Sequence, residues 1–193
     1  GMQVRPPDPL PLVLAELEAS RGAVLIYART RRSVEQWAAR LTGVGVEAIA
    51  YHAGMDPESR QLALEHFQLQ PRPVLVATVA FGMGVDRSDV GLVLHLDLPA
   101  SPEGYLQESG RAGRDGELAR CLVLYDPADR TSLGWAIRGV GAQRQQDQQR
   151  LELAQQQLRR MEAVAEGEGC REQALLLAVG ELAAACGRCD NCR

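Results

Sequence analysis

Short apolar runs alternate with amphipathic segments along the first two thirds of the chain. Because the apolar runs are rich in β-branched residues and end at turn residues, they are typical of strands buried on both faces of a parallel sheet. These predicted strands cover residues 23–27, 46–51, 74–78, 92–96 and 121–125. The segments between them place apolar residues three and four positions apart, which predicts helices. Strands that alternate with helices over short connections predict an α/β fold, with a parallel sheet and helices on both faces.

Residues with short polar side chains mark where several of these helices begin. Thr30 or Ser33 can cap one helix, because a side-chain oxygen at this position accepts a hydrogen bond from a backbone N–H of the first turn. Asp56-Pro57 places a capping carboxylate before a proline at the first helical position, which predicts a helix that runs to about Leu69. Ser101-Pro102 predicts the start of another helix in the same way.

The pattern changes after Pro127, and no further strand is predicted beyond it. A long helix over residues 143–165 is rich in glutamine and arginine, and a shorter helix over residues 171–182 can fold back against its apolar stripe. The N-terminal residues are proline-rich and extended, and a first helix follows them. We therefore predict three segments, which cover residues 1–21 (a connector and the first helix), 22–138 (the α/β domain) and 139–193 (a helical hairpin).

The composition excludes two kinds of chemistry. The net charge is −4, and the sequence contains no lysine. A P-loop needs a lysine for the β- and γ-phosphates, and a Schiff-base enzyme needs one as well, so neither can lie on this chain alone. Phosphate contacts would have to come from local clusters of arginine. No apolar run approaches the length of a membrane span, and no secretory signal pattern is present, so we expect a cytoplasmic protein without a membrane partner.

Four of the five cysteines are close to the C-terminus, with the spacing C-x15-C-x2-C-x2-C. They are Cys170, Cys186, Cys189 and Cys192. Four thiolates in this arrangement predict a tetrahedral zinc site, and in a reducing compartment a metal is favoured over disulfides. Because four protein ligands leave no open coordination position, the zinc would be structural. Iron–sulfur ligation and unliganded core cysteines are the alternatives, and Cys121 is expected to be a packing residue in a strand.

The segment 105–116 carries two arginines among several glycines. On a helix, Gln107, Arg111 and Arg114 would lie four and three residues apart and project from one face. A glycine inside a helix costs roughly 1 kcal/mol relative to alanine, so the glycines here indicate that a backbone or a phosphate must approach closely. Arginine suits phosphate, because its planar fork of donors matches the phosphate oxygens. The alternative is that these arginines lie on a solvated helix end and face no ligand.

The letters Q-x-x-G-R-A-G-R-D-G in this segment resemble motif VI of superfamily-two helicases, in the form found in the RecQ family. Residues 24–40 resemble motif IV, Y-H-A-G-M at 51–55 resembles the RecQ block that follows it, and residues 76–86 resemble motif V. With the cysteines, the resemblance extends from about Val4 to Cys192. It implies the C-terminal RecA-like lobe of an ATP-dependent 3′–5′ DNA helicase, preceded by an interlobe connector and followed by a zinc-binding domain.

The resemblance also implies a role for particular residues. Arg114 would be the arginine finger on ATP and Arg111 would lie beside it on the phosphates, although the sequence alone does not rank the two. The remaining nucleotide-binding residues would be Gln107, Gly84 and Asp86. The DNA-binding residues would be Arg29, Thr30, His52, Thr78 and Met83. Asp86 could instead be a turn-forming carboxylate, and His52 could be a hydrogen-bonded structural residue.

The resemblance finally implies partners that the chain does not contain. ATP and magnesium would lie between this lobe and an N-terminal RecA-like lobe in cis, which would hold the magnesium. The DNA partner would be single-stranded or partially duplex, as in DNA repair and recombination, and the protein would be associated with the bacterial nucleoid. By itself the chain is expected to lack ATPase activity. A stand-alone DNA-binding or regulatory protein derived from a helicase lobe is the alternative, and a DEAD-box RNA helicase is a weaker one.

Overall fold

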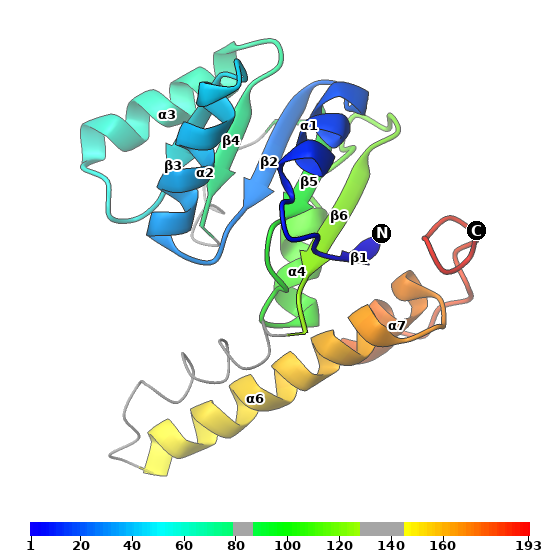
Figure 1. Ribbon diagram of the computed structural model, residues 1–193. Coiled ribbons are helices and arrows are strands. Elements are labelled where there is room, and N and C mark those ends of the chain that lie inside the picture. Colours follow the sequence, from blue (N-terminus) through cyan, green and yellow to red (C-terminus); the bar gives the residue numbers. More distant parts are fainter. Residues whose placement is uncertain (79–86, 128–144) are drawn as a thin grey trace. The chain divides into compact units, whose positions relative to one another are not determined.

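The computed structural model describes residues 1–78, 87–127 and 145–193 (Figure 1). Six strands form one sheet in the order β1-β6-β5-β2-β4-β3, and every strand pair with a defined register is parallel. The strands are β1 (Met2–Val4), β2 (Ala23–Tyr27), β3 (Ala48–Tyr51), β4 (Val74–Ala77), β5 (Val90–His95) and β6 (Arg120–Tyr125). All five predicted strands are present, which confirms the predicted α/β fold with a parallel sheet.

The strand β1 is not among the predicted elements. It has three residues and lies at one edge of the sheet, where Met2 pairs with Val123 and Val4 pairs with Tyr125. A segment this short carries no periodic pattern of its own. It is a strand because β6 offers it the hydrogen-bonding groups of a free edge, which is information that only the folded chain contains.

Two compact units make up the chain. Unit 1 consists of residues 1–4, 98–107 and 123–193, and unit 2 consists of residues 5–97 and 108–122. The predicted domain border at residue 138 lies outside the described residues. Each unit has a core of its own, and the residues of the two cores explain why the local sequence patterns lead to this fold.

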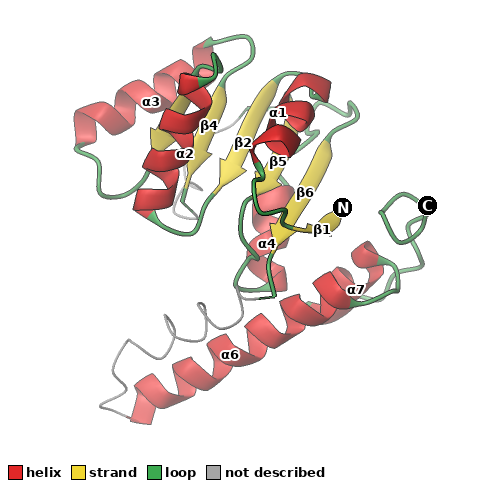
Figure 2. Ribbon diagram, viewed as in Figure 1, coloured by secondary structure: helices red, strands yellow, loops and turns green. Residues whose placement is uncertain are grey.

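Unit 2 holds β2 to β5 and the helices α1 (Leu10–Ala19), α2 (Arg31–Gly43) and α3 (Pro57–Leu69) (Figure 2). All residues of β2 and β4 are buried, so both faces of these strands are covered, as the continuous apolar runs predict. The predicted caps are confirmed: Thr30 Oγ1 accepts a hydrogen bond from the Ser33 N–H at 3.0 Å. Asp56 Oδ1 accepts one from the Ser59 N–H at 2.9 Å.

Unit 1 holds the long helix α6 (Gln145–Glu166) and the shorter helix α7 (Arg171–Ala178), which folds back along it (Figure 1). The predicted hairpin is therefore present. Its shorter helix ends four residues earlier than expected, because Gly180 has a φ of +88° and closes the helix with the hydrogen bonds of a Schellman turn.

The two helices do not bury a separate core. Leu158 and Met161 of α6 and Leu175 of α7 pack with residues from the other segments of unit 1. These are Met2 of β1, Leu98, Tyr105 and Val123 of β6. The apolar stripe predicted on the long helix is thus covered in part by the edge of the sheet, and not by the second helix alone.

Candidate functional site

The segment with the two arginines follows the helix α4 (Pro102–Ser109). Ser101 Oγ accepts a hydrogen bond from the Gly104 N–H at 3.0 Å, so the helix begins where the sequence predicts. It ends at Ser109, and Arg111 and Arg114 lie in the turns that follow. The prediction that Gln107 and both arginines share one helix face is therefore wrong.

Gly113 sets the course of the chain in the turn that follows the helix. This residue has a φ of +65°, which is in the left-handed region, and its N–H donates to the Val90 carbonyl of β5 at 2.9 Å. A Cβ at this position would lie 3.0 Å from the Glu117 carbonyl oxygen. The glycine is therefore needed to form the turn and to bring it against the sheet. It does not clear a helix face for a ligand, as the sequence pattern suggested.

The two arginines have different surroundings. Arg114 is exposed, and its Nε donates to the Gly110 carbonyl at 3.2 Å. Arg111 is half-buried beside Tyr27, the last residue of β2. Burial raises the pKa of Tyr27 to about 12; the Arg111 guanidinium, which hydrogen-bonds to the hydroxyl, acts against the rise, and the Glu108 carboxylate adds to it. Arg114 is thus presented to solvent, whereas Arg111 is held at the end of a strand.

Three residues near Arg111 are not indicated by the sequence pattern. The rings of Tyr27 and His95 are stacked, with their centroids 5.0 Å apart. His95 Nε2 lies 2.6 Å from Glu108 Oε2, and both side chains are buried. One sequence signal was available: His95 is a titratable residue at the end of an otherwise apolar run. Its partner could not be found from the sequence, because it is contributed by a different element.

The predicted DNA-binding residues Arg29 and Thr30 directly follow β2. The Arg29 N–H donates to Asp97 Oδ2 at 3.0 Å, and its guanidinium lies 3.9 Å from Asp97 Oδ1. The Thr30 hydroxyl caps α2. The Arg29 backbone N–H and the Thr30 hydroxyl oxygen are thus hydrogen-bonded within the protein.

The other predicted DNA-binding residues differ in their surroundings. Thr78 follows β4, is half-buried, and donates its N–H to the Tyr51 carbonyl at 3.2 Å. His52 is buried, with Nε2 3.1 Å from Glu35 Oε1 of α2. This environment supports the alternative that His52 is a hydrogen-bonded structural residue. The predicted residues Met83, Gly84 and Asp86 lie outside the described residues.

Arg87 is the first described residue after that gap, and its guanidinium is tightly held. It donates to the backbone carbonyls of Phe67, Gln68, Gln70 and Pro71. These carbonyls lie at the C-terminal end of α3, where free acceptors and the helix dipole favour a cation. Arg87 also pairs with Asp89, and hydrogen bonding from Arg87 holds the pKa of that carboxyl below its usual value. The chain is therefore anchored where it enters β5.

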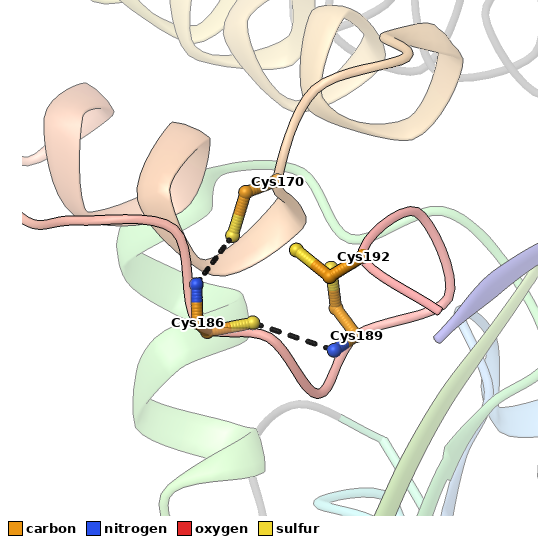
Figure 3. A group of neighbouring side chains, drawn as sticks. All are labelled: Cys170, Cys186, Cys189 and Cys192. Atoms are coloured by element: carbon orange, nitrogen blue, oxygen red, sulfur yellow. Dashed lines mark hydrogen bonds between the residues drawn. The ribbon is translucent and has the colours of Figure 1, made fainter.

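The four predicted metal ligands come together in unit 1 (Figure 3). The sulfur atoms of Cys170, Cys186, Cys189 and Cys192 all lie within 4.8 Å of one another. In a tetrahedral zinc site with Zn–S bonds of about 2.3 Å, the sulfurs would be about 3.8 Å apart, so the cluster fits this ion after a small contraction. Backbone N–H groups point at the sulfurs, for example from Cys186 to Cys170 Sγ at 3.2 Å.

The donor set favours thiolates, which are the metal-binding form of cysteine. Burial raises the pKa of Cys189, but hydrogen bonds from the Arg171 N–H, the Cys192 thiol and the Asn191 N–H outweigh it, and the pKa falls to about 6. The pKa of Cys170 is lowered by the N–H groups of Cys186 and Gln173. Cys192 donates to Cys189, which raises the pKa of Cys192 to about 12. A divalent cation would displace that remaining proton.

Side chains that include Arg171, Asp190 and Asn191 hold the cysteine loop to the rest of unit 1. The Arg171 guanidinium donates to the carbonyls of Val164, Ala165 and Gly167 at the end of α6 and lies 3.3 Å from Asp190 Oδ2. Asp190 also accepts the Met2 N–H at 3.2 Å. The loop between the last ligands therefore contacts both the end of α6 and the edge strand β1.

No helix among residues 1–78, 87–127 and 145–193 is both long and apolar enough to cross a membrane.

Comparison with known families agrees with this arrangement. Residues 9–116 match the family described as helicase conserved C-terminal domain, which covers more than half of the chain. The strands β2 to β5 and the arginine-bearing turn thus lie within a helicase C-terminal domain. Residues 127–193 match the family described as RecQ zinc-binding, and they contain all four clustered cysteines. With both domains in this order, the chain belongs to the RecQ family of helicases.

Individual relatives give the same result. The chain is 38% identical to ATP-dependent DNA helicase Q5 of Mus musculus over 183 residues, which are 93% of this chain and 19% of that protein. It is 40% identical to ATP-dependent DNA helicase RecQ of Haemophilus influenzae over 169 residues, which are 87% of this chain and 26% of that protein. The chain therefore spans about a fifth to a quarter of the length of these two relatives.

Solved structures share the fold. The DEAD-box protein SrmB of E. coli is 27% identical with a TM-score of 0.57, over 67% of this chain and 76% of that one. A DEAD box protein from Methanococcus jannaschii is 21% identical with a TM-score of 0.58, over 80% of this chain and 39% of that one. At the lower identity, the likeness concerns the fold alone.

Proposed function

We propose that this chain acts as the C-terminal part of a RecQ-like, ATP-dependent 3′–5′ DNA helicase. One observation carries the proposal: a helicase C-terminal domain presents Arg114 to solvent on a turn fixed to β5, while the sequence has no lysine from which to build a P-loop. An arginine without its own phosphate-binding loop suits a lobe that completes a site on another lobe. The relatives are named as ATP-dependent DNA helicases, which supports the same activity.

In this proposal Arg114 is the arginine finger and Arg111 binds the phosphates beside it. Charge spreads over the γ-phosphoryl oxygens during hydrolysis, and fixed cations stabilise it. The N-terminal RecA-like lobe would supply the P-loop and hold the magnesium. The remaining nucleotide contacts are assigned to Gln107, which is exposed at the end of α4, and to Gly84 and Asp86.

DNA binding is assigned to the carboxyl ends of the strands, where open parallel sheets generally place their ligands. Arg29, Thr30 and Thr78 would contact the phosphates of a single-stranded or partially duplex DNA, together with Met83. His52 contributes in this proposal by orienting Glu35 and the start of α2, since its own side chain is buried. Such contacts are largely independent of sequence and become weaker as salt rises. Association with the nucleoid would follow from them.

Zinc is assigned a structural role in unit 1, with the four clustered cysteines as ligands. When bound, the ion would fix these thiolates relative to one another and thereby close the hairpin of α6 and α7.

ATP hydrolysis tests the proposal. The chain alone should release no phosphate from ATP, with or without DNA, whereas the chain joined to its N-terminal lobe should show hydrolysis that DNA stimulates. Arg114→Ala should then lower kcat by about 10³ or more. Arg159→Ala, which removes an exposed arginine of α6, is the matched control and should leave kcat unchanged.

Two results would contradict the proposal. Hydrolysis by the isolated chain would show that it carries a nucleotide site of its own. DNA binding without any hydrolysis in the presence of the N-terminal lobe would instead favour a regulatory DNA-binding protein derived from a helicase lobe.

A further inference from the structure

We propose that Tyr27, His95 and Glu108 are positioning residues that hold the Arg111 side chain for phosphate binding. This inference rests on the proposed function, because it takes Arg111 to face a nucleotide. The three residues would not touch the nucleotide themselves and would act through Arg111.

The first part of this cluster is the stack of two rings at the ends of neighbouring strands. Tyr27 and His95 are the last residues of β2 and β5 and are partners in the parallel register. Their rings are nearly parallel, with 20° between the planes and 5.0 Å between the centroids. Because both strands lie inside the sheet, their backbones are fixed. The stacked imidazole therefore restricts the direction in which the Tyr27 hydroxyl points.

Glu108 fixes the imidazole in turn. Its Oε2 lies 2.6 Å from His95 Nε2, and the two residues are 6% and 3% exposed. A buried pair of this kind gives little net stability relative to apolar residues of similar volume, because desolvation offsets the attraction. Because Glu108 lies in α4 just before the arginine-bearing turn, the pair favours a role in geometry over a role in stability.

The cluster holds Arg111 at both ends. At the backbone, the Arg111 N–H donates to the Glu108 carbonyl at 3.3 Å. At the tip, the guanidinium lies beside the Tyr27 hydroxyl and acts on its pKa by charge and by hydrogen bonding. The turn is fixed again two residues later by the hydrogen bond from the Gly113 N–H to the Val90 carbonyl. An arginine restrained in this way needs little reorganisation when a phosphate arrives, which is how fixed charges contribute most to catalysis.

The hydroxyl is also chemically suited to the task. A tyrosine hydroxyl is neutral near pH 7, and burial raises the pKa of Tyr27 further, to about 12, against the effect of the nearby Arg111. A neutral oxygen orients a guanidinium without adding a negative charge beside it. A carboxylate at the same place would orient it equally well but would compete with the phosphate for the same cation.

Kinetics of the helicase that contains both lobes provide the first test. Tyr27→Phe removes one oxygen and keeps the ring that stacks on His95. We expect kcat for DNA-stimulated ATP hydrolysis to fall about tenfold, with less than about a twofold change in KM for ATP and in Kd for DNA. Glu108→Ala should lower kcat further, and Glu108→Gln, which can still accept a hydrogen bond from His95, should restore most of it. Tyr125→Phe, the same change at the last residue of β6, should have no effect.

The order of the Arg111 side chain provides a second test, on the chain alone and without nucleotide. The Nε–H signal of Arg111, assigned by its loss in Arg111→Ala, should show restricted motion in ¹⁵N relaxation of the unmodified chain. It should become mobile in Tyr27→Phe and in Glu108→Ala. An equally ordered signal in folded Tyr27→Phe would overturn the positioning role.

The two tests separate two failures. If Arg111→Ala leaves DNA-stimulated hydrolysis unchanged, the proposed role of Arg111 on the nucleotide is wrong. If Arg111→Ala abolishes hydrolysis while Tyr27→Phe and Glu108→Ala retain the full kcat, Arg111 acts on the nucleotide but does not depend on this cluster, and the further inference is wrong.

Discussion

Units 1 and 2 differ in how their cores are assembled. The core of unit 2 is formed by strands and helices that follow one another along residues 5–97, with the short segment 108–122 added. The core of unit 1 joins α6 and α7 to residues from the N-terminus, from α4 and from β6. Unit 1 thus needs pieces of chain from three places, and its last loop fits a metal ion. We infer that unit 2 is the more self-sufficient of the two, whereas unit 1 depends on the ion to offset the entropy of bringing these pieces together.

Removing the metal should produce the largest difference in stability between the two units. Cys189→Ser, or a strong chelator, should destabilise unit 1 by about 3 kcal/mol or more, because thiolate ligation of a structural zinc is coupled to folding. Hydrogen exchange of backbone amides should accelerate in α6, α7 and β1, with β2 and β4 still protected. Cys121→Ser, which changes the cysteine outside the cluster, is the control. Equal loss of protection in both units would contradict the distinction, and one zinc per chain by elemental analysis would support it.

Truncation of one buried side chain in each core should give effects of comparable size. Phe67 of α3 and Met161 of α6 are both fully buried. Phe67→Ala should cost about 3–5 kcal/mol and Met161→Ala about 2–5 kcal/mol, from lost burial and the cavity that remains. Hydrogen exchange measured peptide by peptide should show that Phe67→Ala lowers the protection of amides in unit 2. Met161→Ala should lower the protection of amides in α6, α7 and also β1, because Met2 packs in the same core. Unchanged protection of β1 would contradict the shared core.

Each unit contains an arginine that binds the carbonyls at the end of a helix and pairs with an aspartate. Arg87 does this at α3 and Arg171 at α6. Replacing either by alanine should cost about 2–3 kcal/mol, since several hydrogen bonds to a charged donor are lost. The effect of Arg171→Ala should depend on whether zinc is bound, because its partner Asp190 lies between two metal ligands, whereas the effect of Arg87→Ala should not. Urea unfolding with and without a chelator would measure the difference.

The smallest expected effect concerns pH. The hydrogen bond from Arg87 lowers the pKa of Asp89 from its usual value of 3.8. A lowered folded-state pKa gives stability that is present above the usual value and is lost as the pH falls through the lowered one. The loss should be at most about 1 kcal/mol, because the Asp89 side chain is 43% exposed and water screens the pair. Asp89→Asn should flatten the dependence of the urea midpoint on pH below 4. An identical slope in this variant would contradict the assignment.

Local pattern was sufficient for most of unit 2 and for the metal ligands. The runs at 23–27 and 74–77 are strands because continuous apolar β-branched residues have few alternatives to a buried sheet. Thr30 and Asp56 cap their helices because their side chains satisfy N–H groups of their own first turn. The cysteines are predicted as ligands from their spacing, since Cys186, Cys189 and Cys192 repeat the C-x2-C pattern that brings neighbouring thiolates to one ion.

The geometry around Arg111 could not be predicted from local sequence patterns. The spacing of Arg111 and Arg114 fits a helix, but α4 ends at Ser109, and Gly113 takes a left-handed conformation that fixes the following turn against β5. The strand β1 and the contact of Tyr27 with Arg111 are likewise formed between segments far apart in the sequence.

What can be read from the amino-acid order is the set of elements, their caps, the metal ligands and the family, because each of these leaves a pattern of residue types and spacings in the sequence itself. The folded chain alone settles the turn that carries the arginines, the buried tyrosine–histidine–glutamate cluster beneath it, and the core that joins α6 and α7 to β1. These depend on which distant segments pack together, and the periodicity of apolar residues shows which face of an element is buried but not which other segment covers it.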